Sequence, residues 1–172
     1  MKPVSMFKII VILAYFTLAL CNRPTSAVTN SQFLPDSTLT PGDTLPGAME
    51  HICTSGYTKT VRHVTKSMKE RVYRLYKITH HKRGEYEIDH LISLELGGSN
   101  DIKNLWPQPY LTEPWNAHKK DRLETRLKRL ICVHKITLQE AQYAIAHDWV
   151  AAYKKYIQEP VDNEAEDNSD ED

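Results

Sequence analysis

The strongest constraint on the fold is the stretch 86–110, which reads YEIDHLISLELGGSNDIKNLWPQPY. Residues 86–96 alternate in part between apolar and polar side chains, which predicts a strand. Gly97-Gly98 begins a turn, and residues 102–106 can return as a second short strand. Three prolines follow within the next eight residues and prevent long regular structure there. The stretch therefore predicts a short β-hairpin that carries an adjacent acid and histidine on its first strand.

Helices are predicted on both sides of this hairpin. Residues 65–77 have helical apolar spacing, with Thr65 or Ser67 as the N-cap and a basic opposite face. A second helix is expected from Asn116 to about residue 132, with a leucine stripe. A last helix from residue 137 begins with a Thr-x-x-Glu capping box. The predicted order is linker, helix, hairpin, helix and helix, which is an α+β arrangement.

Both ends of the chain differ in composition from its middle. Residues 1–27 have basic residues, an apolar run over 9–20 and small residues before Ala27, as in a cleaved signal peptide. The alternatives are an uncleaved anchor and, less well supported, a lipoprotein site at Cys21. Residues 28–50 are rich in Thr, Ser, Pro and Gly and are expected to be a flexible linker. A domain over 51–158 follows, and we expect the mature protein to be secreted or periplasmic.

Two cysteines, Cys53 and Cys132, remain after the predicted cleavage. An even count in an exported chain favours one disulfide, which would join the segment before the first helix to the end of the helix that follows Trp115. Two buried thiols are the alternative if the protein stays in the cytosol. The absence of a Cys-x-x-Cys pair argues against a cysteine zinc site.

The formal net charge of zero hides two opposite regions. Residues 159–172 contain eight acids and no base, and are expected to be disordered. Residues 50–158 contain 19 Lys and Arg against 12 Asp and Glu. A basic domain fits a polyanionic partner, and the acidic tail could improve solubility or shield the basic face.

The residue types in and after the hairpin suit phosphate chemistry. His90 can act as a general base near neutral pH, and Asp89 can bind a hard cation through oxygen. Neighbours on one strand point to opposite faces, so both can serve one site only at a strand end or a twist. Asn116 could supply an amide oxygen to the same metal. A set of basic residues within two turns of it could hold phosphates: His118, Lys119, Lys120 and Arg122.

Four motifs occur together in order: Asp89-His90, the Gly97-Gly98 turn, Asn104-Leu105 and Asn116-x-x-Lys119. This combination resembles the HNH, or ββα-metal, endonuclease superfamily. More loosely, residues 50–150 resemble small exported bacterial or phage-type members of it. The resemblance implies a hairpin-plus-helix core with flanking helices, and phosphodiester hydrolysis as the reaction.

The resemblance also implies a role for each motif residue. His90 would be the catalytic base that takes a proton from the attacking water, and Asn104 would fix the hairpin and orient His90. Asp89 and Asn116 would bind one divalent cation, with Mg²⁺ expected first and Mn²⁺, Ca²⁺, Zn²⁺ or Ni²⁺ as alternatives. The last motif residue is Asn rather than His and lies 26 residues after His90. His118 and Glu124 therefore remain rival ligands.

The function expected from these observations is a metal-dependent endonuclease of low sequence specificity that acts on DNA, with RNA as a second substrate. No zinc finger or second DNA-binding domain is recognisable in the sequence. The alternatives are a non-catalytic nucleic-acid-binding protein that keeps the fold, and an exported interaction protein. We expect a monomer without stable membrane association after signal cleavage. The sequence identifies no inhibitor protein.

Overall fold

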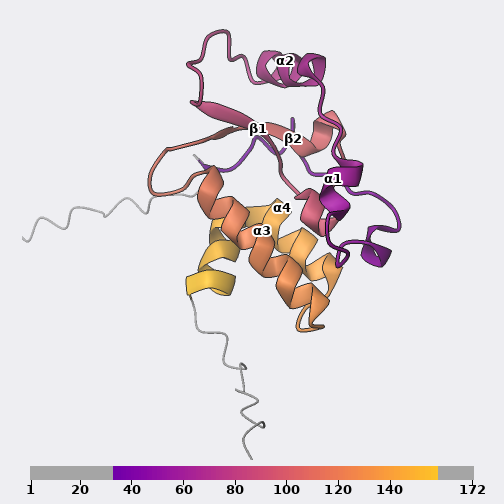
Figure 1. Ribbon diagram of the computed structural model, residues 1–172. Coiled ribbons are helices and arrows are strands. Elements are labelled where there is room, and N and C mark those ends of the chain that lie inside the picture. The colour runs from indigo at the N-terminus through magenta and orange to yellow at the C-terminus, as the bar shows by residue number, and fades with distance from the viewer. Residues whose placement is uncertain (1–32, 159–172) are drawn as a thin grey trace, which may run out of the picture.

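The computed structural model describes residues 33–158, so the predicted signal peptide and acidic tail lie outside the described residues. A two-stranded antiparallel sheet of β1 (Tyr86–His90) and β2 (Leu105–Pro109) lies at the centre. Helices α1 (Tyr57–Val61) and α2 (Lys66–Leu75) precede it, and α3 (Ala117–Cys132) and α4 (Leu138–Tyr153) follow it. The expected α+β arrangement is confirmed at this level, with α2 on one side of the hairpin and α3 and α4 on the other (Figure 1).

Both strands differ from the predicted ranges. β1 ends at His90, and residues 94–96 form a short 3₁₀ helix, η3 (Leu94–Leu96), instead of continuing the strand. A second 3₁₀ turn, η4 (Ile102–Asn104), leads into β2, which contains Pro107 and Pro109. The ladder hydrogen bonds at the two ends of the hairpin place these prolines where the missing N–H would point away from β1. Proline therefore does not interrupt the strand.

The helices begin where the capping residues predict. Thr65 accepts a hydrogen bond from the backbone of Met68 at the start of α2, and Asn116 accepts one from Lys119 at the start of α3. Thr137 and Glu140 form both bonds of the capping box before α4. A π-helical turn, η5 (Lys154–Gln158), extends α4. Local hydrogen-bonding chemistry thus defines the N-terminus of each long helix.

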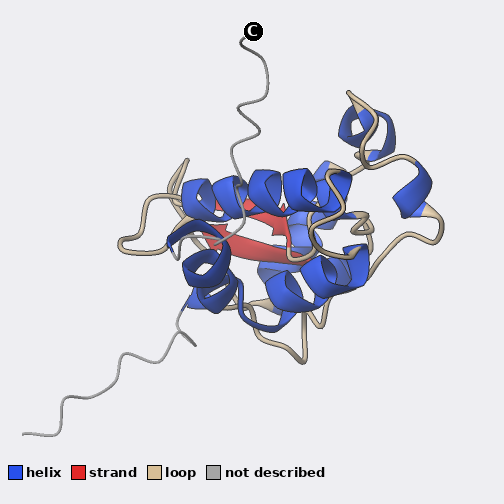
Figure 2. Ribbon diagram, turned by 90° about the horizontal axis from the view of Figure 1, so that it is seen from below, coloured by secondary structure: helices blue, strands red, loops and turns tan. Residues whose placement is uncertain are grey.

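The main core lies where α3 and α4 pack together beneath the hairpin (Figure 2). α3 contributes Leu123 and Leu127, and α4 contributes Ile145 and Trp149, all at most 1% exposed. The last helix therefore contributes directly to the core. Within residues 33–158, no helix is both long enough and apolar enough to cross a bilayer.

Residues 33–50 pack onto the domain rather than forming the flexible linker expected over 28–50. The carbonyl of Phe33 accepts a hydrogen bond from the indole N–H of Trp149, and Thr40 donates to the carbonyl of Leu105. Thr44 forms an isolated bridge with Gly98, and a 3₁₀ turn, η2 (Ala48–Glu50), follows. The Thr- and Pro-rich composition suggested a flexible linker. The segment is ordered instead because its backbone groups find hydrogen-bond partners on the core without forming regular structure.

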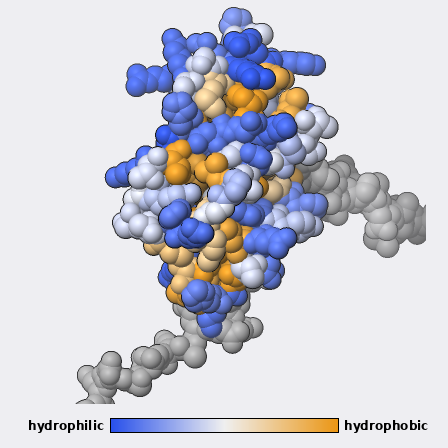
Figure 3. Space-filling model, turned by 90° about the vertical axis from the view of Figure 1, so that its right-hand side faces the viewer, coloured by the Kyte–Doolittle hydropathy of each residue, from blue (hydrophilic) through white to orange (hydrophobic). Residues whose placement is uncertain are grey.

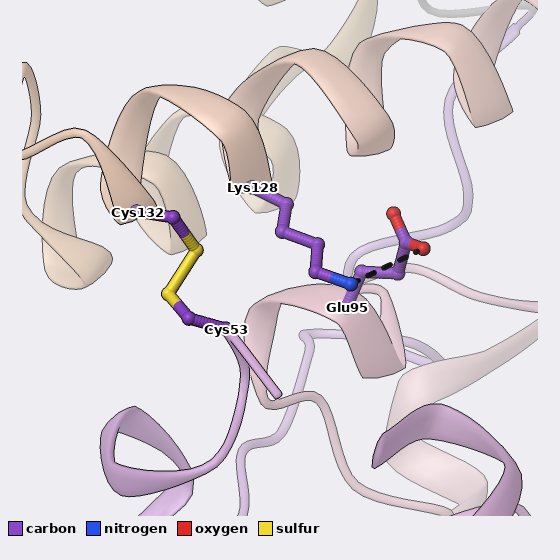
Figure 4. Close-up of a disulfide and its surroundings, with 4 residues drawn as sticks. All are labelled: Cys53, Glu95, Lys128 and Cys132. Carbon is purple, nitrogen blue, oxygen red and sulfur yellow. Dashed lines mark ion pairs between the residues drawn. A yellow bond between two sulfur atoms is a disulfide. The ribbon is translucent and has the colours of Figure 1, made fainter. Parts of the chain in front are cut away.

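Cys53 and Cys132 form a disulfide that ties the segment before α1 to the end of α3 (Figure 4). The bridge spans 79 residues of sequence. Beside it, Lys128 of α3 points toward Glu95 of η3, at an N–O distance of 3.9 Å. Both contacts attach α3 to segments that precede β2 in the sequence.

Candidate catalytic centre

Asp89 and His90 occupy the last two positions of β1, so their side chains leave opposite faces of the hairpin. Asp89 faces α3, where its Oδ2 atom lies 2.7 Å from the Nζ atom of Lys120. The His90 ring lies on the other side, with its Nε2 atom 3.2 Å from the Oδ1 atom of Asn100. The two residues are therefore neighbours in sequence with different partners.

Asn100 defines which ring nitrogen of His90 carries the proton. Its Nδ2 donates to the carbonyl of Val61 at 2.8 Å, and its Oδ1 accepts the backbone N–H of His63 at 2.9 Å. These two bonds orient the amide, so its oxygen is the atom that faces the imidazole. An amide oxygen only accepts, so Nε2 of a neutral His90 donates to it. Nδ1 is left as the nitrogen with the lone pair.

Asn104 fixes the hairpin, which is one of the two roles that the resemblance implies, but the contact that orients the His90 ring comes from Asn100. The Asn104 side chain is fully buried and bonds the backbone N–H and carbonyl of Ile92 and the carbonyl of Ser99. These contacts close the loop between the strands, while the contact with the His90 ring belongs to Asn100. Sequence reasoning missed Asn100, although it lies in the same Gly-Gly-Ser-Asn turn.

The closed loop also explains the Gly97-Gly98 pair. A Cβ atom on Gly98 would lie 1.7 Å from the carbonyl oxygen of Ile92, which no side chain can tolerate. Gly97 has a φ of +73°, and a Cβ there would lie 2.5 Å from the Cβ atom of Ala48. The glycines are needed because the loop backbone folds back onto Ile92, just after β1, and against Ala48 of the N-terminal segment.

Lys120 is a fully buried cation beneath the end of β1. Its Nζ atom donates to Oδ2 of Asp89, to the carbonyl of His90 at 2.7 Å and to Oε1 of Glu124. Burial alone would lower the pKa of Lys120, but the negative charges and hydrogen bonds of Asp89 and Glu124 raise it above its ordinary value. Lys120 therefore stays protonated and holds the backbone and side chain at the end of β1.

Burial and nearby charges adjust the pKa values around this centre. Burial lowers the pKa of His90, while the carboxylate of Asp89 and the hydrogen bond that His90 donates to Asn100 partly oppose that effect. Burial, together with the charges of Asp89 and Asp121, raises the pKa of Glu87 to about 7. His90 is thus mainly neutral at pH 7, as a general base must be.

The two expected metal ligands do not form a prepared cation site. Asp89 binds the ammonium of Lys120 through one oxygen, and the Oδ1 atom of Asn116 caps α3 while its Nδ2 donates to Glu113. The rival ligand Glu124 is paired with Lys120 as well. Across residues 33–158, no cluster of three His, Cys, Asp or Glu side chains is arranged to hold a metal ion. The residues present therefore do not fit the metal that the resemblance implies.

The expected phosphate-binding residues on α3 are also dispersed. Lys120 is buried, and Lys119 donates to Glu113 and to the carbonyl of Pro114. The ring of exposed His118 lies 4.7 Å from that of Tyr110. Arg122 is exposed and remains available to a ligand.

Comparisons with known proteins identify no protein that is similar to this chain. No model of a known protein family matches the chain, and neither a curated protein nor a solved structure does. The candidate centre therefore rests on its own geometry: a neutral histidine with a defined tautomer, at the end of a strand that a buried lysine holds in place.

Proposed function

We propose that the protein is an endonuclease that hydrolyses phosphodiester bonds in DNA, and also in RNA, with low sequence specificity. The observation that carries the proposal is the tautomer of His90 that Asn100 imposes. A neutral imidazole with a free Nδ1 is the state required of a base that activates water. The resemblance in motif order supports a phosphodiester as the substrate.

In the proposed reaction, Nδ1 of His90 takes a proton from a water molecule as its oxygen attacks the phosphorus atom. The bond between phosphorus and the leaving sugar oxygen breaks, and that oxygen acquires a proton from solvent. The carboxylate of Asp89 favours the positive imidazole that forms, because its charge partly opposes the burial that lowers the pKa of His90. The Oδ1 atom of Asn100 continues to accept the hydrogen bond from Nε2–H throughout.

No step is assigned to a metal ion, because Asp89 and Asn116 are engaged within the protein. His90 is only 1% exposed. The proposal therefore requires a local movement that admits water and a phosphate to Nδ1. Export of the protein is proposed together with the activity, because a disulfide suits an oxidising compartment.

The test is cleavage of plasmid DNA and of RNA by the wild type and by His90→Ala, each with Mg²⁺, Mn²⁺ or EDTA. We expect at least about a hundred-fold loss of activity in His90→Ala, the usual scale for removal of a general base. His147→Ala, which changes an exposed histidine on α4, should retain wild-type activity. Equal rates in wild type and His90→Ala would reject His90 as the base.

The burial of His90 specifically supports one alternative function, which is nucleic-acid binding without cleavage. A protein that binds nucleic acid without cutting it would keep the fold and could leave this ring enclosed. Tight binding of DNA without cleavage under every metal condition would favour that alternative.

A further inference from the structure

The positive charge of the domain is concentrated in one segment. Residues 57–85, which we call the basic arm, contain nine Lys and Arg but only two Glu. The remainder of residues 50–158 has ten Lys and Arg and ten Asp and Glu. The basic arm consists of α1, α2 and the loop before β1. The whole excess of positive charge therefore comes from one contiguous part of the fold.

The basic side chains of α2 are free to meet a ligand. Lys66, Lys69, Arg71 and Arg74 are all exposed. Among the ion pairs of residues 33–158, Lys66–Glu70 is the one that involves α2, at 3.9 Å. The end of the molecule where α2 lies is crowded with hydrophilic side chains (Figure 3). Apart from Lys66, the basic residues of this set are thus not neutralised by an ion pair within the described part of the chain.

The basic arm also reaches the candidate catalytic centre. Asn100, which contacts the His90 ring, is bound to the backbone at Val61 and His63. Arg62, between them, is close enough for its charge to act on His90. α2 itself packs against β2, on the side of the hairpin away from α3. A polyanion lying along the arm would therefore pass close to His90.

The length of α2 suits several phosphates of one backbone. Ten helical residues extend about 15 Å, which is close to the rise of four base pairs of duplex DNA. By contrast, the bases predicted on α3 are either buried, like Lys120, or bound within the protein, like Lys119. The substrate surface is thus better placed on α2 than on the start of α3.

We propose that the basic arm is the surface that holds the phosphate backbone of the nucleic acid, with α2 as its main contact. The inference deepens the proposed nuclease function by placing its substrate. Binding should depend on charge and shape rather than base sequence, because Lys and Arg on this surface would contact phosphates. The proposal concerns binding and does not depend on the identity of the catalytic base.

The test compares two full-length proteins that each lose four positive charges, both in the His90→Ala background. The arm variant replaces Lys66, Lys69, Arg71 and Arg74 with Gln. The control variant makes the same change to Gln at four exposed residues on α3, the turn after it and η5: Arg129, Lys135, Lys154 and Lys155. Fluorescence anisotropy with a labelled DNA duplex gives the affinity over a range of salt concentrations, and thermal unfolding verifies that both variants are folded.

For the arm variant we expect roughly a hundred-fold weaker binding near physiological salt. The slope of log affinity against log salt should fall by about 3 to 4, since each phosphate contact contributes about 0.9. The control variant should keep most of the affinity and slope. Equal losses in the two variants, or no loss in the arm variant, would overturn the proposal. Cleavage by His90→Ala would instead reject only the catalytic proposal and leave this result standing.

Discussion

The ammonium of Lys120 lies 2.7 Å from the carboxylate of Asp89 and is completely shielded from solvent. Two residues 31 positions apart are joined in this way, so that α3 is fastened to the end of β1. The same ammonium also bonds the backbone carbonyl of His90. The orientation of the candidate catalytic residues thus depends on a residue that a substrate cannot reach.

The first prediction concerns the stability that this lysine provides. Lys120→Met should lower the free energy of unfolding by about 3 kcal/mol or more, because it leaves the carboxylates of Asp89 and Glu124 buried without a cation. Lys128→Met on the same helix breaks a longer, partly exposed pair with Glu95 and should cost at most about 1 kcal/mol. Urea unfolding of both variants measures the difference. Comparable losses of unfolding free energy in the two variants would show that the burial of Lys120 does not make its ion pairs more stabilising.

A second prediction separates two asparagines that the sequence motifs treat alike. Asn104→Ala should cost about 3 kcal/mol of unfolding free energy, because three buried backbone groups of the loop lose their partner. Asn116→Ala removes the N-cap of α3 and should cost about 1 kcal/mol. Thermal or chemical unfolding of the pair tests this order. A larger loss for Asn116→Ala would contradict the assignment of Asn104 as the residue that closes the loop.

The turn and the start of α3 in this region could be predicted because each depends on local chemistry, whereas the ends of both strands could not. Gly97-Gly98 marks the tight approach of the loop, and Asn116 marks the start of α3. The link between Asn100 and His90 could not be predicted, since it requires α1 to lie beside the turn. Nor could the burial of Lys120, because its three acceptors come from β1 and α3 and meet only in the folded chain.

The third prediction is the pH dependence of cleavage. His90 must be neutral to accept a proton, and burial lowers its pKa below the ordinary 6.5. The acid limb of kcat/KM should therefore have its midpoint below pH 6.5. Asn100→Ala should move the midpoint lower, because the hydrogen bond that His90 donates to Asn100 raises the pKa of His90. Asn100→Asp should move it higher through its negative charge. A limb that stays in place in both variants would show that another group controls the rate.

The fourth prediction concerns Glu87, whose pKa is raised from 4.5 to about 7. Between those values the unfolded chain loses the proton while the folded protein keeps it, so rising pH lowers stability over this range. Glu87→Gln removes that cost. It should leave stability nearly unchanged at pH 4, and raise it by about 1 kcal/mol at pH 8, since solvent screens part of the effect at this half-buried position.

Thermal unfolding of wild type and Glu87→Gln across this pH range measures the difference. Asp101→Asn, at an exposed carboxylate, is the matched control and should show no such growth in stability with pH. A gain for Glu87→Gln that is the same at both ends of the range would mean that folding does not raise the pKa of Glu87.

The hydrogen bond from Trp149 to the carbonyl of Phe33 joins residues 116 positions apart. Closing so long a loop is entropically costly before other contacts repay it, and contacts of this separation slow the search for the native state. The segment 33–50 rests on surfaces that α4 and the β1–β2 loop provide, so those surfaces must exist before it can dock. During synthesis, the segment 33–50 would therefore dock only after α4 has emerged and folded, although it is made long before that helix.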